Sequence, residues 1–356
     1  MRPYKRWIII TGAFILLNFF LLGLFNFIVD PYQFYRKAQY EPYFIENPYY
    51  QNPGLARSYD YDTVIIGNSY SENFVPSFVN RTLGLKTIKL TAGGSSIREQ
   101  HLILKVALET GKAKNVIWGL DILSLRDGLV SYFPEYLYDK DPFNDYYYLL
   151  NYDATKNSCK IVADYFGLLK INHMDIDILG NWNSNFKFGK DIVLSPYKKA
   201  NKSKRASRLN KKGSNSFYED AMKNLDEYVI SLIDQYKTAT FHIVYPPHSI
   251  LFFRKDLYEN DEEAFKDYLA MKRYIIEKLR DRRNVKIYDF QDVKEITFNL
   301  DNYKDSAHYH QRINEYVIES ISKNRHLVTV HNIEEHLENL RRQVAGFRFE
   351  DLLSSR

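Results

Sequence analysis

Cysteine is almost missing from this chain, which has one, Cys159, among 356 residues. A single thiol excludes an internal disulfide framework and a zinc site made of several cysteines. No His-x-x-x-His pair encloses a glutamate, so we expect no catalytic metal. Glycine-rich phosphate-binding patterns and internal repeats are also missing, and the sequence therefore gives no support for a nucleotide cofactor.

Long apolar runs are equally scarce, and the only one covers Trp7 to Val29. As a helix it spans roughly 35 Å at about 1.5 Å per residue, enough for the core of a bilayer. Basic residues precede it, so the positive-inside rule predicts a cytoplasmic N-terminus and an extracytoplasmic remainder. A cleaved signal peptide is the alternative, but such peptides end in small residues, whereas this run ends in Phe27-Ile28-Val29. We therefore expect residues 1–29 to be a single-pass membrane anchor.

The rest of the chain has the composition of packed globular protein. It is 45% hydrophobic and 16% aromatic with a formal charge of +5, which suffices for one large domain or two smaller ones. Residues 30–58 are rich in Tyr, Pro and Asn and are predicted to be an irregular stalk. Outside the cytoplasm, nucleic acid is not an expected partner.

Short apolar runs alternate with helical patterns across residues 59–325. This alternation predicts an α/β domain with a doubly wound, mainly parallel sheet in three layers. The expected strands are Asp62–Gly67, Lys86–Leu90, Asn115–Gly119, Thr240–Val244 and Asn284–Phe290. The expected helices are Ile97–Thr110, Phe217–Lys237, Glu262–Arg280 and Gln311–Ser322.

Residues 122–215 interrupt this rhythm and are predicted to be an insertion that forms a lid or a substrate-facing subdomain. The insertion ends in a basic run, 198–212, which would either meet an anionic lipid or polymer or form a solvated loop. Residues 326–356 are charged and partly amphipathic, and they form a predicted helical tail that docks a partner or covers the domain.

Polar and glycine residues follow the first three predicted strands. Ser69 follows the first, where we expect a helix to begin whose dipole and N–H groups would favour an oxyanion. Gly94 follows the second strand and would allow close backbone approach, and Asp121 follows the third. Because the carboxyl ends of parallel strands share one edge of a sheet, these residues are expected to converge.

A carboxylate and an imidazole, Asp305 and His308, stand three residues apart near the end of the domain. A serine becomes a nucleophile when a base takes its proton, and the base acts best when a carboxylate orients it. Ser69, Asp305 and His308 therefore form a candidate triad for acyl transfer. His310 is the rival base, and His248 is either a site-lining or a structural histidine.

These motifs resemble those of the SGNH (GDSL-type) hydrolase superfamily. Gly67-Asn68-Ser69 matches its Gly-Asp-Ser block, Gly94 its second-block glycine, and Asp305 to His308 its Asp-x-x-His block. The resemblance implies a flavodoxin-like SGNH fold with Ser69 as nucleophile. Asn68 and Asp121 depart from the pattern, and Asp121 stands where an asparagine would donate to the oxyanion.

The single anchor makes the chain similar to membrane-anchored SGNH-like acyltransferases of polysaccharide acetylation and teichoic-acid D-alanylation. This likeness implies an extracytoplasmic O-acyltransferase, most often an acetyltransferase, that modifies a surface polysaccharide. It also implies a multi-pass membrane-bound O-acyltransferase as the partner that supplies the acyl group. An SGNH esterase and a non-catalytic polymer-binding scaffold are the alternatives.

Overall fold

The computed structural model describes residues 3–45, 47–126, 132–199 and 217–349. The chain divides into two compact units, each described by itself below. The first, here called the N-terminal unit, joins Met1–Asp60 with Tyr132–Leu179. The second, the sheet unit, joins Tyr61–Ser131 with Gly180–Arg356.

The N-terminal unit begins with the long helix α1, Pro3–Val29. Its segment Tyr4–Val29 is long and apolar enough to cross a membrane, and its side chains are almost all exposed. The predicted apolar helix is therefore confirmed as a helix of membrane-spanning length. Asp30 follows at a positive φ, and its carboxylate accepts the N–H groups of Phe34, Tyr35 and Arg36, which turns the chain away from α1.

The prediction of an irregular stalk over residues 30–58 is wrong for its second half. Asn47 caps helix α2, Pro48–Ser58, with its side-chain oxygen, and most of α2 is buried. Pro48 is tolerated because it stands in the first turn, where its missing N–H has no partner to lose. The other elements of this unit are the 3₁₀ turns Glu135–Leu137, Pro142–Asn144 and Ile176–Ile178 and the helices α5 (Tyr146–Leu149) and α6 (Tyr152–Tyr165).

The sheet unit contains a six-stranded sheet in the order β2-β1-β3-β4-β5-β6. The first five strands are parallel, and β6 pairs antiparallel with β5. The predicted α/β class with a mainly parallel sheet is thereby confirmed. The strands are β1 (Thr63–Gly67), β2 (Thr87–Lys89), β3 (Asn115–Gly119), β4 (Thr240–Tyr245), β5 (Val285–Asp289) and β6 (Leu327–Val328).

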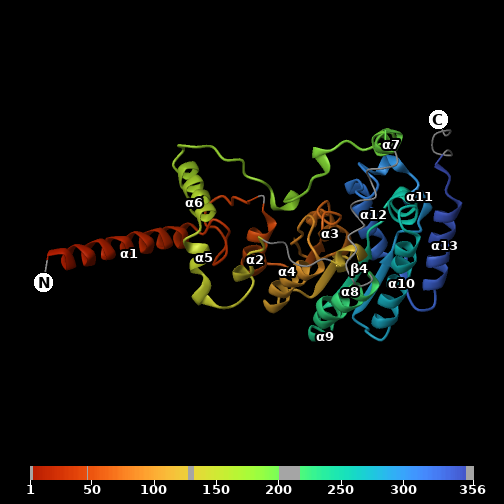
Figure 1. Cartoon of the computed structure of the whole chain (residues 1–356), viewed down its shortest axis with the longest axis horizontal. Helices are drawn as coiled ribbons and strands as arrows, with labels where there is room; N and C mark the ends of the chain where they lie inside the picture. Colours follow the sequence, from red (N-terminus) through yellow and green to blue (C-terminus); the bar gives the residue numbers. More distant parts are fainter. Residues whose placement is uncertain (1–2, 46, 127–131, 200–216, 350–356) are drawn as a thin grey trace. The chain divides into compact units, whose positions relative to one another are not determined.

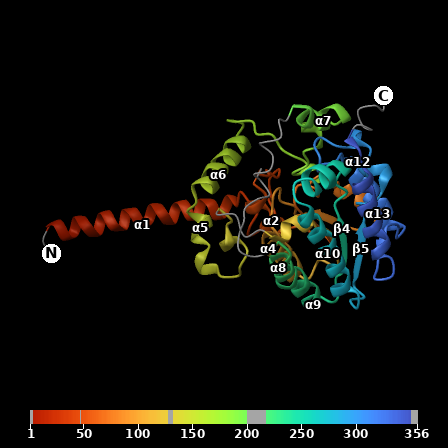
Figure 2. The same cartoon turned by 45° about the vertical axis from the view of Figure 1, so that its right-hand side comes forward.

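Helices cover both faces of this sheet (Figures 1 and 2). On one face, Ile65, Ile117 and Tyr288 pack with Val79 of α3 and Val317 of α12 in one buried cluster. On the other face, the Trp118 indole of β3 donates to Gln100 of α4 at 2.8 Å. The helices of this unit are α3 (Pro76–Leu83), α4 (Ile97–Glu109), α7 (Lys190–Lys199), α8 (Phe217–Asn224), α9 (Ser231–Gln235), α10 (Glu262–Leu279), α11 (Lys294–Thr297), α12 (Gln311–Ser322) and α13 (Ile333–Gly346). Shorter turns are Ile122–Arg126, Asn183–Asn185 and Leu300–Asn302, with π-helical turns at Leu225–Ile230 and Phe252–Tyr258.

The predicted tail folds back onto its own sheet unit. Leu337, Leu340 and Val344 of α13 are fully buried, and Arg273 of α10 donates to Glu334 of α13. Of the two readings of this segment, covering the domain is the one that these contacts support.

The structure divides the predicted insertion, residues 122–215, between the two units. Residues 132–179 belong to the N-terminal unit, whereas residues from Gly180 onward belong to the sheet unit. Residues 200–212 of the basic run lie outside the described residues.

Candidate active site

Three side chains predicted from the sequence lie in a hydrogen-bonded row. Ser69 Oγ is 2.9 Å from His308 Nε2, and His308 Nδ1 is 2.9 Å from Asp305 Oδ2. Asp305 Oδ1 also accepts the N–H groups of Ala307 and His308 at 2.9 and 2.7 Å. This is the geometry in which an imidazole can take the serine proton while a carboxylate holds its tautomer.

The electrostatics of Asp305 suit this arrangement. Burial raises the pKa of its carboxyl, but the hydrogen bonds and charge of His308 and the N–H of Ala307 outweigh burial and lower the pKa to about 2. Asp305 is therefore ionised at neutral pH and able to stabilise an imidazolium at His308.

Ser69 lies in a turn and not, as predicted, at the start of a helix. Residues Ser69 to Asn73 form consecutive turns, and α3 begins only at Pro76. The Asn68 side chain explains this local structure, since its Oδ1 accepts the Tyr70 N–H at 3.2 Å and its carbonyl accepts the Ser71 N–H. The predicted contribution of a helix dipole at Ser69 is thus wrong.

Two glycines allow this turn to close over the sheet. Gly67 and Gly119 are register partners at the ends of β1 and β3, and the Ser71 side chain lies against both. A Cβ on Gly67 would lie 2.9 Å from the Gly119 carbonyl oxygen and 2.9 Å from Ser71 Cβ, atoms that no side-chain rotation can move away. A side chain at Gly67 would therefore displace the turn that carries Ser69.

Gly67→Ala should lower the free energy of unfolding by roughly 1–3 kcal/mol, because its Cβ would overlap the Gly119 carbonyl oxygen and Ser71 Cβ and force the chain to shift. Urea unfolding of the full chain, followed by tryptophan fluorescence, measures the effect. Gly346→Ala is the matched control, since a Cβ there meets nothing within 4 Å. Equal stability of the two variants would contradict the packing argument.

The loop that carries Asp305 and His308 is closed at its base. Tyr303 and Tyr309, both buried, form an antiparallel bridge, and the Lys304 N–H donates to the His308 carbonyl. The Tyr309 hydroxyl donates to the Tyr70 carbonyl at 3.2 Å, which ties this loop to the serine turn. Residues 239 positions apart are thereby held within hydrogen-bonding distance.

The segment that follows β4 forms hydrogen bonds with the same loop. Ser249 Oγ donates to the Ser306 carbonyl at 2.7 Å, and His248 Nδ1 contacts the Ala307 carbonyl at 3.3 Å. His248 is completely buried, and its Nε2 has no hydrogen-bond partner in the described part of the chain. His248 therefore positions the loop, which favours the structural reading of this histidine.

The rival base, His310, has a different task. Its side chain accepts the Arg312 N–H at 3.1 Å and so caps α12. Burial and the nearby Arg312 lower its pKa. His308 is the histidine that contacts Ser69.

Asp121 lies beside the triad but already has partners. Its Oδ2 accepts the Asn68 amide at 3.2 Å, and its Oδ1 accepts the Leu123 N–H at 3.1 Å. A structural role for Asp121 is supported, because its carboxylate holds the Asn68 side chain that shapes the serine turn.

The predicted backbone donors to the oxyanion are the N–H groups of Ser69 and Gly94. Ala92 donates to the Gly67 carbonyl, and this extension of the β2–β1 pairing places the Gly93–Gly94 turn just beyond the end of β2. Gly94 has φ of 71°, which favours glycine. Neither the Ser69 nor the Gly94 N–H donates a hydrogen bond within the described residues.

Sequence reasoning missed the aromatic and charged groups around the triad. Trp182 donates its indole N–H to the Ser69 carbonyl at 3.0 Å and meets the His308 ring edge to face. Lys304 lies 4.0 Å above the Trp182 ring. Burial raises the pKa of the nearby Glu72 carboxyl, although the Gly93 N–H and Lys89 oppose this. No local motif marks these residues, because only the fold brings residue 182 to residue 69.

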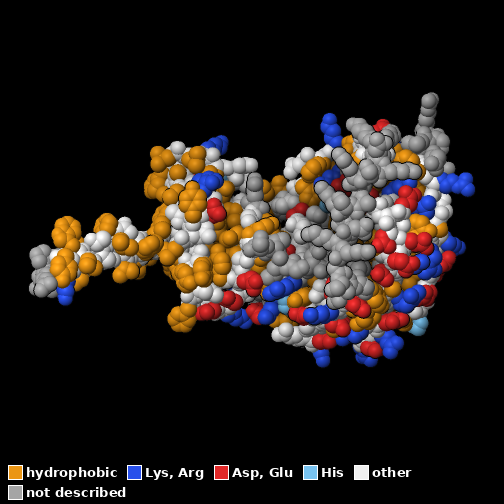
Figure 3. Space-filling view, in the orientation of Figure 1, with side chains coloured by type: hydrophobic (Ala, Val, Ile, Leu, Met, Phe, Trp, Pro, Cys, Tyr) orange, Lys and Arg blue, Asp and Glu red, His pale blue; other side chains and the backbone are white. Residues whose placement is uncertain are grey.

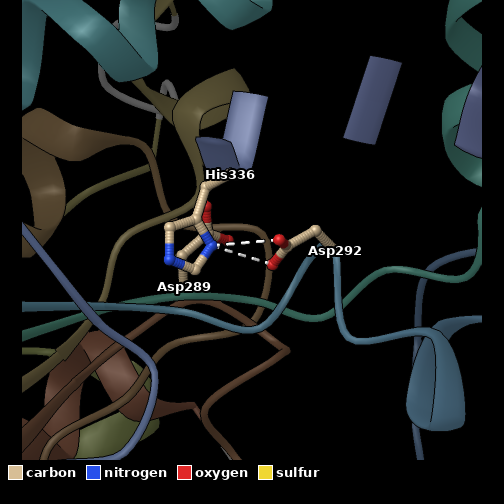
Figure 4. A group of neighbouring side chains, drawn as sticks. All are labelled: Asp289, Asp292 and His336. Atoms are coloured by element: carbon tan, nitrogen blue, oxygen red, sulfur yellow. Dashed lines mark hydrogen bonds and ion pairs between the residues drawn. The ribbon is translucent and has the colours of Figure 1, made fainter. Parts of the chain in front are cut away.

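A second cluster, Asp289, Asp292 and His336, combines residue types that bind metals (Figure 4). His336 Nδ1 contacts both Asp292 oxygens at 3.0 Å, and the buried Lys272 ammonium pairs with Asp289. Burial lowers the pKa of His336, but the Asp292 carboxylate outweighs it and raises that pKa. These contacts link α13 to the end of β5.

Comparison with protein-family models and with curated proteins gives no match. No protein-family model matches the chain, and no curated protein resembles it at a significant level. The geometry of the site is therefore the evidence for what the protein does.

Proposed function

We propose that this protein is a membrane-anchored, extracytoplasmic O-acyltransferase, specifically an acetyltransferase, that modifies a cell-surface polysaccharide. The observation that carries the proposal is the row Ser69, His308, Asp305, with both hydrogen-bonded contacts at 2.9 Å. The parallel sheet with helices on both faces supports a three-layer, doubly wound fold of the SGNH type.

In this mechanism, His308 Nε2 takes the Ser69 proton as Oγ attacks the acyl carbonyl of the donor. The tetrahedral intermediate collapses when His308 returns that proton to the leaving alcohol, and an acyl ester remains on Ser69. His308 then takes the proton of a sugar hydroxyl, whose oxygen attacks the acyl-enzyme. Collapse transfers the acyl group to the sugar, and Ser69 regains its proton from His308.

Stabilisation of the oxyanion is assigned to the Ser69 and Gly94 N–H groups, because both are without internal acceptors among the described residues. Asp121 contributes indirectly through Asn68. Gly93 and Gly94 are exposed and the triad is only partly buried, which suits an acceptor as large as a polymer.

α1 supports the proposed membrane location. Its length and apolar surface suit a bilayer, and Arg2, Lys5 and Arg6 favour the cytoplasmic side for its start. The sheet unit then works outside the cytoplasm, where acyl donors have to be delivered across the membrane. A multi-pass membrane-bound O-acyltransferase is the partner we propose for that delivery.

An assay of the full chain in lipid nanodiscs separates this function from its alternatives. A chromogenic acetyl ester is offered with and without de-O-acetylated polysaccharide from the producing cells. Acetate transferred to polysaccharide supports a transferase, whereas release that polysaccharide does not change favours an esterase. If a fluorophosphonate fails to label Ser69, the scaffold alternative gains and the catalytic proposal fails.

A further inference from the structure

The N-terminal unit exposes large apolar side chains outside α1. On α5, α6 and their flanks, six such side chains are more than half exposed, and five of them are aromatic. We call this set the collar: Phe143, Tyr147, Tyr152, Tyr165, Phe166 and Leu168. Figure 3 shows hydrophobic side chains gathered over α5 and α6 around the end of α1. A surface of this kind marks an interaction site.

Hydrogen bonds fasten the collar to the C-terminal end of α1. The Asn26 amide donates to the Leu149 carbonyl at 2.7 Å and to Thr155 Oγ1 at 2.8 Å. The buried Tyr148 hydroxyl donates to Asp30 at 2.8 Å, just after α1 ends. These contacts fasten α5 and the start of α6 to the last turns of α1. The position of the collar along α1 is therefore fixed.

The length of α1 indicates where the collar lies relative to the bilayer. The 26-residue segment Tyr4–Val29 is longer than a bilayer core needs, since about 20 residues span about 30 Å. With Arg6 outside the core, counting from Trp7 places the outer hydrocarbon boundary close to Asn26. α5 and α6 therefore lie at the headgroup region. Arg36, which donates to the Phe27 carbonyl at 2.6 Å, supplies a cation at the same level.

We propose that the collar is a second membrane-contact surface, whose occupant is the interfacial layer of the outer leaflet. This inference depends on anchoring by α1, as proposed above. Lipid is the occupant that fits, because the collar is continuous with a lipid-facing helix and because three of its side chains are tyrosines, which are enriched at the membrane interface. The N-terminal unit is thus seated on the membrane and does not act as a free tether.

Site-specific fluorescence tests the collar in the full chain. In a Cys159→Ser background, Leu168→Cys and Tyr152→Cys are each labelled with the polarity-sensitive dye NBD and reconstituted in phosphatidylcholine–phosphatidylglycerol nanodiscs. We expect a blue-shifted emission that falls by roughly half when the lipids carry a shallow doxyl quencher, as for groups buried at the interface. Val330→Cys, an exposed position of the sheet unit, is the reference for a label at the surface of the protein.

Leu21→Cys in α1 separates failure of the collar from failure of the anchor. If doxyl lipid quenches position 21 while positions 152 and 168 remain as accessible to aqueous iodide as position 330, the collar proposal is overturned and anchoring stands. If position 21 is not quenched either, both fail. Collar positions shielded from iodide and from doxyl lipid alike would indicate a protein occupant, which also overturns the proposal.

Discussion

Ser69→Ala should abolish acyl transfer, with a loss of about 10⁵- to 10⁶-fold as for other serine triads. The hydroxyl is the group that attacks the acyl carbon, and alanine leaves His308 with no proton to take. Structure should be unaffected, because His308 is the only hydrogen-bond partner of Ser69 Oγ among the described residues and the turn is held by Asn68 and Trp182. Acetate incorporation into polysaccharide by the full chain measures the loss.

The control for this experiment is Ser184→Ala, which removes another hydroxyl from the sheet unit. Ser184 is exposed, and its Oγ lies 3.5 Å from Asn185. It should retain full transfer and full labelling by a fluorophosphonate, whereas Ser69→Ala should lose both. Unchanged transfer in a folded Ser69→Ala protein would rule out the acyl-enzyme.

Lys272→Met should destabilise the sheet unit by about 3–5 kcal/mol, as expected when one partner of a buried ion pair is removed. Lys272 and Asp289 are both fully buried and paired, and the Lys272 ammonium also donates to Gln291 at 2.9 Å. Methionine fills a similar volume but leaves the Asp289 charge without a cation. Urea unfolding followed by the fluorescence of Trp118, in the buried β3, reports the change.

Lys266→Met on the same helix provides the comparison. Lys266 is 56% exposed and pairs with Glu262 and Glu263, and such surface pairs contribute at most about 1 kcal/mol. Adding Asp289→Asn to Lys272→Met should restore part of the lost stability, because the buried charge is then removed. If Lys272→Met unfolds at the same urea concentration as Lys266→Met, the ion pair does not contribute as argued.

Apolar periodicity predicted the helices and strands whose own residues form an apolar run or a helical pattern. The apolar runs at Asn115–Gly119 and the helical pattern at Gln311–Ser322 agree with β3 and α12 residue for residue. β6 was missed, because two residues that pair antiparallel at an edge have no pattern of their own. α2 was missed as well, because its prolines and glycine indicate a loop and its stability comes from burial.

The sequence by itself determined the mainly parallel α/β class, the apolar N-terminal helix and the residue types of the triad, because these depend on local composition and on the order of motifs. Tertiary structure alone decided which residues meet. It chose His308 over His310, engaged Asp121 with Asn68, brought Trp182 to Ser69 and divided the predicted insertion between two units. These outcomes depend on contacts between residues far apart in the chain, which no local pattern encodes.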